Sequence, residues 1–317
     1  MERNGAVMKS FAFALCLLFA ASAQAAEWQP SPGHTQVPLW PGTVPDAVAL
    51  PGPETMAMTE GEKLVGGRNY MYLRNISQPT LTVYSPQGKN TGASVVVFPG
   101  GGFEILAMDL EGTEVCDWLT ANGITCVLLK YRVPSLPFDW HCKCRPDNYV
   151  IPTQALEDAQ RAMGLVRFHA AEWRIDPHKV GVLGFSAGGY LVASISTNYG
   201  HRLYAPVDAA DKESARPDLA VAVYPGHIEK HGSLNPNVPV TGDTPPTFLV
   251  QAEDDDVDGV DEVLVYFAAL KQAGVPTEMH IYAQGGHAFG LRPTKLPITH
   301  WPELVIPWLK TIGMIPQ

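Results

Sequence analysis

Short apolar runs alternate with amphipathic segments along most of the chain after residue 62. Apolar runs bounded by Gly, Pro or Asn are typical of strands buried on both faces of a sheet. They predict strands at Thr80–Tyr84, Ser94–Phe98, Thr125–Lys130, Val180–Phe185, Leu219–Tyr224, Thr247–Gln251 and Glu278–Tyr282. Helical spacing predicts helices over Glu111–Ala121, Pro152–Glu172, the stretch after Ser186, Asp261–Ala273 and His300–Thr311. This alternation predicts an α/β fold, a mostly parallel central sheet with helices on both faces.

The first residues follow a different pattern. Lys9 precedes the apolar run Phe11–Ala20 and the small-residue pattern Ala23-Gln24-Ala25, which together are typical of a signal peptide and its cleavage site. The run is shorter than the roughly 20 apolar residues that a spanning helix needs. We therefore expect residues 1–25 to be removed on export, leaving a secreted or periplasmic protein without a membrane anchor. Met8 offers a second start site within this segment.

The next segment, residues 26–62, is rich in proline and lacks helical periodicity. Proline fixes φ and has no backbone N–H, so such a segment favours extended and turn conformations. We predict an N-terminal extension that lies over the surface of one catalytic domain, residues 63–317. A long loop at Pro134–Asn148 is a candidate wall of the substrate site.

Composition narrows the classes of partner. The formal net charge is −10 and no run of Lys and Arg occurs, so the surface lacks the cations that neutralise phosphates. Nucleic acid is therefore excluded as an expected partner, and a small-molecule or polysaccharide substrate is favoured. The 46% hydrophobic content of the 317 residues is enough for a sizeable core.

Four cysteines remain after the expected cleavage: Cys116, Cys126, Cys142 and Cys144. Cys116 lies in a predicted helix and Cys126 in a predicted strand, where both fit as buried small apolar residues. A disulfide between them is the alternative, since an exported protein meets an oxidising compartment. Cys142 and Cys144 favour a local disulfide over a metal site, because no second ligand pair at zinc-site spacing occurs. We expect no metal and no cofactor.

The strongest motif is Gly184-Phe185-Ser186-Ala187-Gly188, between the apolar run from Val180 and a helical stretch. This is the G-x-S-x-G nucleophile elbow in its required strand-to-helix context. The tight turn lifts the serine hydroxyl clear of the sheet, and the flanking glycines avoid clashes there. The context predicts Ser186 as a catalytic nucleophile.

A serine hydroxyl needs a base and a group that orients the base. His287 lies on the glycine-flanked loop Gly285–Gly290 after the last predicted strand, whereas His280 falls inside that strand and His300 begins a helix. We predict His287 as the base. The orienting acid is expected in the cluster after Gln251; its spacing favours Asp255, with Asp254 and then Asp256 as alternatives and Asp258 and Asp261 weaker.

Acyl transfer also needs N–H donors for the oxyanion. The glycines of Pro99-Gly100-Gly101-Gly102-Phe103 follow an apolar strand, and they allow backbone N–H groups to approach a substrate closely. We predict Gly101 and Gly102 in the oxyanion hole, with the N–H of Ala187 as a further donor. A phosphate-binding loop is the alternative, but neither G-x-G-x-x-G nor a following Lys-Ser or Lys-Thr is present.

These motifs, with Leu129–Pro134, occur in the order of a known family. The chain resembles the bacterial acetyl-xylan-esterase-like branch of the α/β-hydrolases, often grouped with feruloyl esterases, over about Leu39 to Pro307. The resemblance implies the α/β-hydrolase fold and places the family's nucleophile on Ser186, its base on His287 and its acid within Asp254–Asp256. Two departures are Ala288, where glycine is common, and a cysteine-bearing insertion around Trp140.

The resemblance implies a serine esterase that deacetylates hemicellulose or acetylated sugars. A feruloyl or broad short-chain carboxylesterase is the alternative within the class, and a peptidase of the same fold is less favoured. A catalytically silent carbohydrate-binding protein is the non-enzyme alternative, since folds of this kind also serve without turnover. Phe103, Phe138 and Trp140 are candidates for stacking on the substrate, and core packing is the competing interpretation for each.

Overall fold

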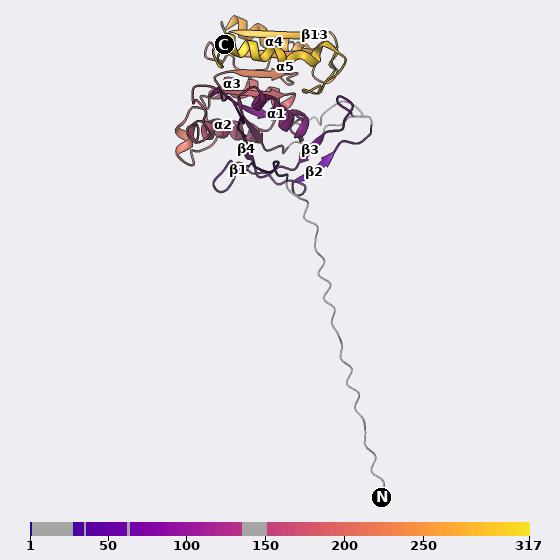
Figure 1. Ribbon diagram of the computed structural model, residues 1–317, viewed down its shortest axis with the longest axis vertical. Coiled ribbons are helices and arrows are strands. Elements are labelled where there is room, and N and C mark those ends of the chain that lie inside the picture. The colour runs from indigo at the N-terminus through magenta and orange to yellow at the C-terminus, as the bar shows by residue number, and fades with distance from the viewer. Residues whose placement is uncertain (2–27, 35, 62–63, 135–150) are drawn as a thin grey trace.

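The computed structural model describes residue 1 and residues 28–34, 36–61, 64–134 and 151–317. At its centre lies an eight-stranded sheet in the order β1-β4-β7-β5-β8-β9-β12-β13, whose β13 edge is at the top of Figure 1 and whose β1 edge is at the bottom. The strands are β1 (Gln36–Pro38), β4 (Thr80–Tyr84), β5 (Ser94–Phe98), β7 (Thr125–Lys130), β8 (Val180–Phe185), β9 (Ala220–Val223), β12 (Thr247–Ala252) and β13 (Thr277–Tyr282). From β7 to β13 all neighbours are parallel, and β1, β4 and β7 pair antiparallel.

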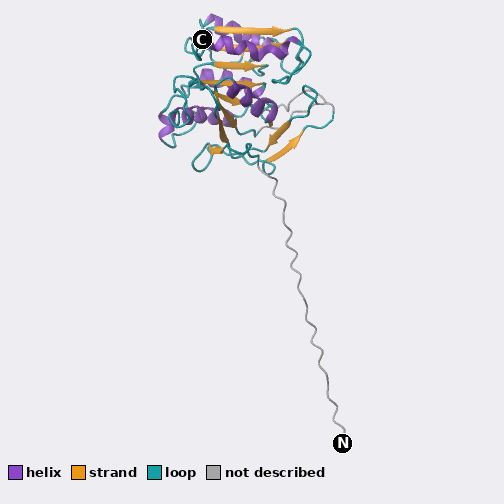
Figure 2. Ribbon diagram, in the orientation of Figure 1, coloured by secondary structure: helices purple, strands orange, loops and turns teal. Residues whose placement is uncertain are grey.

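The predicted central strands are confirmed. Every residue of β5, β7, β8 and β12 is buried, which explains their apolar sequences. The sheet is covered by helices, shown in purple in Figure 2: α1 (Glu114–Ala121), α2 (Thr153–Phe168), α3 (Ala187–Asn198), α4 (Asp261–Gln272) and α5 (Trp301–Thr311). The fold is therefore the predicted α/β class. A single π-helical segment, Asp109–Thr113, precedes α1 where the sequence predicted one continuous helix from Glu111.

Two smaller sheets lie outside the central one. One contains β2 (Thr55–Met58), β3 (Met71–Arg74) and β6 (Ile105–Ala107), paired antiparallel. The other is the hairpin of β10 (Glu229–Lys230) and β11 (Ser233–Leu234). Short 3-10 segments occur at Ala209–Lys212 and Pro297–His300. The three-stranded sheet places Arg74 and Ile105 beside the glycine loop that follows β5.

The N-terminal extension is more deeply integrated than the sequence predicted. Its strand β1 joins the central sheet beside β4, and Leu39 and Trp40 are buried in the core. Trp40 Nε1 donates a hydrogen bond to Asp158 Oδ1 at 2.9 Å, and Arg161 Nε donates to the Leu39 carbonyl at 3.0 Å. The described residues of the segment form the short strands β1 and β2 joined by turns and bends. The proline-rich composition did not reveal that buried polar groups of α2 bind this segment.

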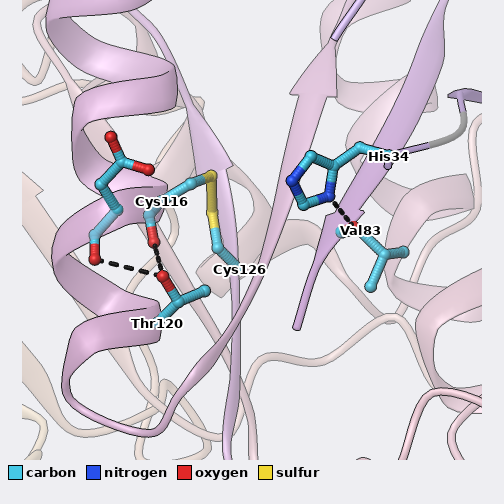
Figure 3. Close-up of a disulfide and its surroundings, with 6 residues drawn as sticks. His34, Val83, Cys116, Thr120 and Cys126 are labelled. Atoms are coloured by element: carbon cyan, nitrogen blue, oxygen red, sulfur yellow. Dashed lines mark hydrogen bonds between the residues drawn. A yellow bond between two sulfur atoms is a disulfide. The ribbon is translucent and has the colours of Figure 1, made fainter. Parts of the chain in front are cut away.

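Cys116 of α1 and Cys126 of β7 form a disulfide, shown in Figure 3. The prediction that both are unbridged small apolar residues is therefore wrong, although both are fully buried. The turn at Asn122–Ile124 folds α1 back along β7 and brings the two Cα atoms to 5.1 Å, a separation typical of disulfides. Spacing alone did not reveal this, because the sequence does not show which helix face meets the strand.

Removing this disulfide with the double substitution Cys116→Ala and Cys126→Ala is expected to lower the free energy of unfolding by about 2 to 3 kcal/mol. The bridge closes a short loop, with a sequence separation of 10, so the unfolded chain gains moderate entropy when it is removed. Urea unfolding of the wild type, the double variant and the wild type in dithiothreitol measures the effect. Equal midpoints for wild type and variant would contradict the expectation.

Several sequence predictions lie outside the described residues. They are the signal peptide apart from Met1, the candidate stacking residues Phe138 and Trp140, and Cys142 and Cys144. In the part of the chain that the structure describes, no helix combines the length and apolar character needed to cross a membrane.

Candidate active site

Ser186 stands at the sharp turn between β8 and α3. Its backbone has φ 51° and ψ −118°, a conformation that side-chain-bearing residues adopt only at a cost of about 1 to 3 kcal/mol. The turn also requires glycine on both sides. A β-carbon at Gly184 would overlap the Gly188 carbonyl, and one at Gly188 would overlap the Phe98 carbonyl. The local sequence therefore fits the strained turn that carries the hydroxyl.

The structure brings Ser186, His287 and Asp255 into one hydrogen-bonded chain. His287 Nε2 lies 3.0 Å from Ser186 Oγ, and His287 Nδ1 lies 2.8 Å from Asp255 Oδ2. The Asp255 side chain is fully buried, and its Oδ1 accepts the backbone N–H groups of Val257 and Asp258. These bonds fix the carboxylate so that it can hold the imidazole in one orientation.

The three adjacent aspartates of the acid cluster occupy different environments. Asp255 contacts the imidazole, whereas Asp254 Oδ1 accepts the N–H groups of Gly285 and Gly286 at 2.8 and 2.7 Å. Asp256 is exposed. Asp254 thus holds the backbone of the loop that carries His287. Of the three, Asp255 alone has the geometry that the sequence spacing favoured for the orienting acid.

The predicted oxyanion glycines share a cavity with Ser186, and Ala187 follows Ser186 in the chain. Gly101 and Gly102 line the same cavity as Ser186 and have φ values of 129° and 65°, a backbone conformation that favours glycine. The Gly101 carbonyl accepts the N–H groups of Glu104 and Ile105, which closes the loop. Ala187 begins α3, so its N–H has no acceptor within the helix. These groups can donate to negative charge that develops beside Ser186.

A buried carboxyl group that sequence reasoning missed links the glycine loop to the histidine loop. Glu111 Oε2 accepts the Gly100 N–H at 2.6 Å, and Glu111 Oε1 accepts the Tyr224 hydroxyl at 2.8 Å. Tyr224 in turn accepts the Gly290 N–H and places its ring edge-on to the His287 ring, with centroids 5.0 Å apart. Burial raises the pKa of Glu111 by more than its hydrogen bonds with Tyr224 and Gly100 lower it, so the net shift is upward. The network positions both loops against Ser186.

Asp258 is a second carboxylate at the reacting groups. Its Oδ2 accepts a hydrogen bond from Ser186 Oγ at 3.3 Å and lies 3.8 Å from His287 Nε2. The sequence placed Asp258 among the weaker candidates for the orienting acid. Its position on the Nε2 side of the ring excludes that role, because the orienting acid must bind Nδ1.

These charges act on His287. Burial lowers the pKa of His287. The hydrogen bond with Asp255 and the negative charges of Asp258, Asp255 and Glu111 raise it by a larger amount, so the net shift is upward from 6.5. A raised pKa means that the imidazole binds its proton more tightly. The histidine is correspondingly a stronger base once it is neutral.

The esterase activity that the resemblance implies should rise with pH as His287 loses its proton, with the acidic limb of kcat/KM centred above the usual histidine pKa of 6.5. Only the neutral imidazole accepts the Ser186 proton, so the raised pKa moves the limb upward. Phenyl acetate hydrolysis measured between pH 5 and 9 tests this. Asp258→Asn should move the limb downward, and a wild-type limb at or below 6.5 would contradict the expectation.

Ser186 and His287 open into a cavity of about 470 Å³, a size typical of small-ligand sites. Tyr70, Ile105 and Val257 supply part of its wall, and Ala288 lies on it with a positive φ of 61°, which explains why glycine suits this position. Of the two interpretations left open for Phe103, the structure agrees with core packing. The residue is 1% exposed, and its ring packs against Tyr131, Tyr190 and His227.

Within the described ranges, no three His, Cys, Asp or Glu side chains come together as a metal site.

Comparison with known proteins agrees with this architecture. The family model described as BD-FAE matches residues 81–225, and that of the prolyl oligopeptidase family matches residues 225–312. An acetyl ester-xyloside bifunctional hydrolase from Caldicellulosiruptor lactoaceticus has a similar structure, with TM-score 0.67 and 30% identity over 89% of this chain and 97% of that one. A thermophilic esterase from Thermogutta terrifontis shares the fold, with TM-score 0.62 and 22% identity over 75% of this chain and 89% of that one.

Two curated relatives are longer proteins. An acetylxylan esterase from Xylanibacter ruminicola is 30% identical over 217 residues, which are 63% of this chain and 42% of that protein. Endo-1,4-beta-xylanase B from Butyrivibrio fibrisolvens is 25% identical over 66% of this chain and 34% of that protein. The chain thus spans less than half the length of either relative.

The parallel sheet and the serine at its strand-to-helix elbow define an α/β-hydrolase. The chain belongs to the α/β-hydrolase esterases, in the branch of the acetylxylan esterases.

Proposed function

We propose that this protein hydrolyses carboxylic esters through an acyl-enzyme on Ser186, and that its substrates are acetyl groups on hemicellulose or on acetylated sugars. The observation that carries the proposal is the hydrogen-bonded chain from Asp255 through His287 to Ser186, which opens into the cavity. The choice of acetyl esters is supported by the acetylxylan esterase and the acetyl ester-xyloside hydrolase to which the chain is similar.

In the proposed reaction, His287 Nε2 takes the proton of Ser186 Oγ as the oxygen attacks the acetyl carbonyl. Asp255 stabilises the imidazolium, and N–H groups of Gly101, Gly102 and Ala187 bind the oxyanion. His287 then gives its proton to the leaving alcohol, and water repeats the sequence on the acyl-enzyme. No step requires a metal or a cofactor.

We also propose that the protein acts after export, in the periplasm or outside the cell. The signal-peptide pattern at residues 1–25 supports this. The buried Cys116–Cys126 disulfide supports it independently, because such bonds persist in oxidising compartments.

A feruloyl esterase is the second candidate, because the chain resembles a branch of the α/β-hydrolases that is often grouped with feruloyl esterases. The test compares acetate release from acetylated xylan with ferulate release from feruloylated arabinoxylan, using purified protein and its Ser186→Ala variant. We expect Ser186-dependent release of acetate. Ferulate release without acetate would assign the second candidate, and failure of a fluorophosphonate to label the folded wild type would favour a non-catalytic carbohydrate-binding protein.

A further inference from the structure

The cavity carries several carboxylates, and Asp258 differs from the others. Glu104 pairs with Arg74 at 2.7 Å, and Glu262 accepts the N–H groups of Ile228 and Glu229. Those partners are structural groups of the protein and not catalytic ones. The Asp258 carboxylate instead contacts Ser186 and His287, the two groups that meet the ester.

Backbone and packing contacts fix the direction of this carboxylate. The Asp258 N–H donates to Asp255 Oδ1 at 3.0 Å, and the Asp258 carbonyl accepts Gln251 Nε2 at 2.6 Å. Gly226 packs directly against this carboxylate, and a β-carbon at position 226 would overlap both of its oxygens, so the Asp258 side chain would have to move. The same buried aspartate, Asp255, thus orients His287 and holds the turn that carries Asp258. The Asp258 side chain remains 15% exposed, toward the cavity that it lines.

The leaving alcohol must lie beside this carboxylate. When the acyl-enzyme forms, His287 Nε2 donates its proton to the ester oxygen, which therefore lies within hydrogen-bond reach of Nε2. Asp258 Oδ2 is 3.8 Å from the same nitrogen. A hydroxyl on the carbon next to the ester-bearing carbon can therefore reach Asp258. An ionised carboxylate only accepts hydrogen bonds, so it favours a donor at that place.

We propose that Asp258 binds the free hydroxyl adjacent to the ester in the alcohol part of the substrate, so that the enzyme selects monoacylated vicinal diols, as in partly acetylated sugars. This inference rests on the proposed esterase function. The substrate hydroxyl replaces Ser186 Oγ as the donor to Asp258 Oδ2, and the Ser186 proton is then directed to His287. An ester whose neighbouring oxygen is alkylated or acylated lacks the donor and faces the carboxylate with an acceptor.

The test uses two small esters, 2-hydroxyethyl acetate and 2-methoxyethyl acetate, which differ in the donor on the neighbouring carbon. Acetate release gives kcat/KM for each, and the ratio of the two values is the readout. Any effect of a substitution on folding, on Ser186 or on the basicity of His287 acts on both esters and cancels in the ratio. We expect a wild-type ratio of roughly 10 to 100, the range for one hydrogen bond to a charged group.

Asp258→Asn and Asp258→Ala should bring this ratio close to 1. Asp261→Asn is the matched control, because it removes the same charge from an exposed residue at the start of α4, outside the cavity lining. It should keep the wild-type ratio. A wild-type ratio near 1, or a high ratio that survives in both Asp258 variants, would overturn the inference and leave the esterase function intact. Absence of Ser186-dependent hydrolysis of both esters would overturn the two together.

Discussion

Replacing Ser186 with alanine is expected to lower kcat for acetate esters on the order of a millionfold, the loss found when a triad nucleophile is removed. Oγ supplies the only oxygen that His287 Nε2 is placed to activate, at 3.0 Å, in the part of the chain that the structure describes. The oxyanion groups and the cavity stay in place, so a small residual rate above that of water should remain. Phenyl acetate hydrolysis by purified variant, free of wild-type enzyme, measures the loss.

A matched control lies on the same helix. Ser196 of α3 is fully buried, and its hydroxyl has no hydrogen-bond partner among the described residues. Ser196→Ala should therefore keep full activity. Both variants should show the circular dichroism spectrum of the wild type. If Ser186→Ala kept more than about a thousandth of the wild-type kcat, the acyl-enzyme mechanism would be wrong, because a triad without its nucleophile loses far more.

The sequence predicted the centre of the fold well, for a physical reason. Strands buried on both faces need apolar residues at every position, so β5, β7 and β8 have the predicted bounds. The short strands of the N-terminal region were not predicted. β1 and β2 have three and four residues, too few for a pattern of alternation, and proline-rich surroundings suggested a surface segment.

The candidate site could be predicted where its residues stand in local motifs. The elbow and the glycine-flanked histidine each carry a backbone requirement that is visible in the sequence, and the structure places Ser186 and His287 in contact. Asp258 and the pair Glu111 and Tyr224 act through contacts between distant segments; Glu111 and Tyr224 are 113 positions apart. No local pattern encodes such a contact. Glu111 and Asp258 also stand among other acidic residues in the sequence, so their surroundings did not single them out.

The same limit left two interpretations of Phe103 open in the sequence. An aromatic residue beside a glycine loop suggests a stacking surface, but its positive φ of 59° turns the side chain away from the cavity and into the core. The conformation of the loop decides the direction of the ring, and composition does not reveal it.

Asp255→Asn should lower kcat about ten-thousandfold while the fold persists, which would distinguish the proposed orienting acid from its acidic neighbours. An amide at this position preserves the shape but loses the charge that stabilises the imidazolium, and its NH2 group favours the wrong imidazole tautomer. Asp255 Oδ2 lies 2.8 Å from His287 Nδ1. A neighbouring carboxylate could reach this nitrogen only if the turn that carries the acids moved.

The neighbours supply graded controls in the same assay. Asp256→Asn changes an exposed side chain and should keep nearly full activity. Asp254→Asn keeps an oxygen that can accept the Gly285 and Gly286 N–H groups, so it should cost less than about tenfold. Asp258→Asn leaves the Asp255 to His287 contact intact, and its loss should stay well below that of Asp255→Asn, because Asp258 lies at Nε2 and cannot orient Nδ1. A larger loss of kcat in Asp258→Asn than in Asp255→Asn would show that the imidazole ring is flipped in the working enzyme and that Asp258 is its orienting acid.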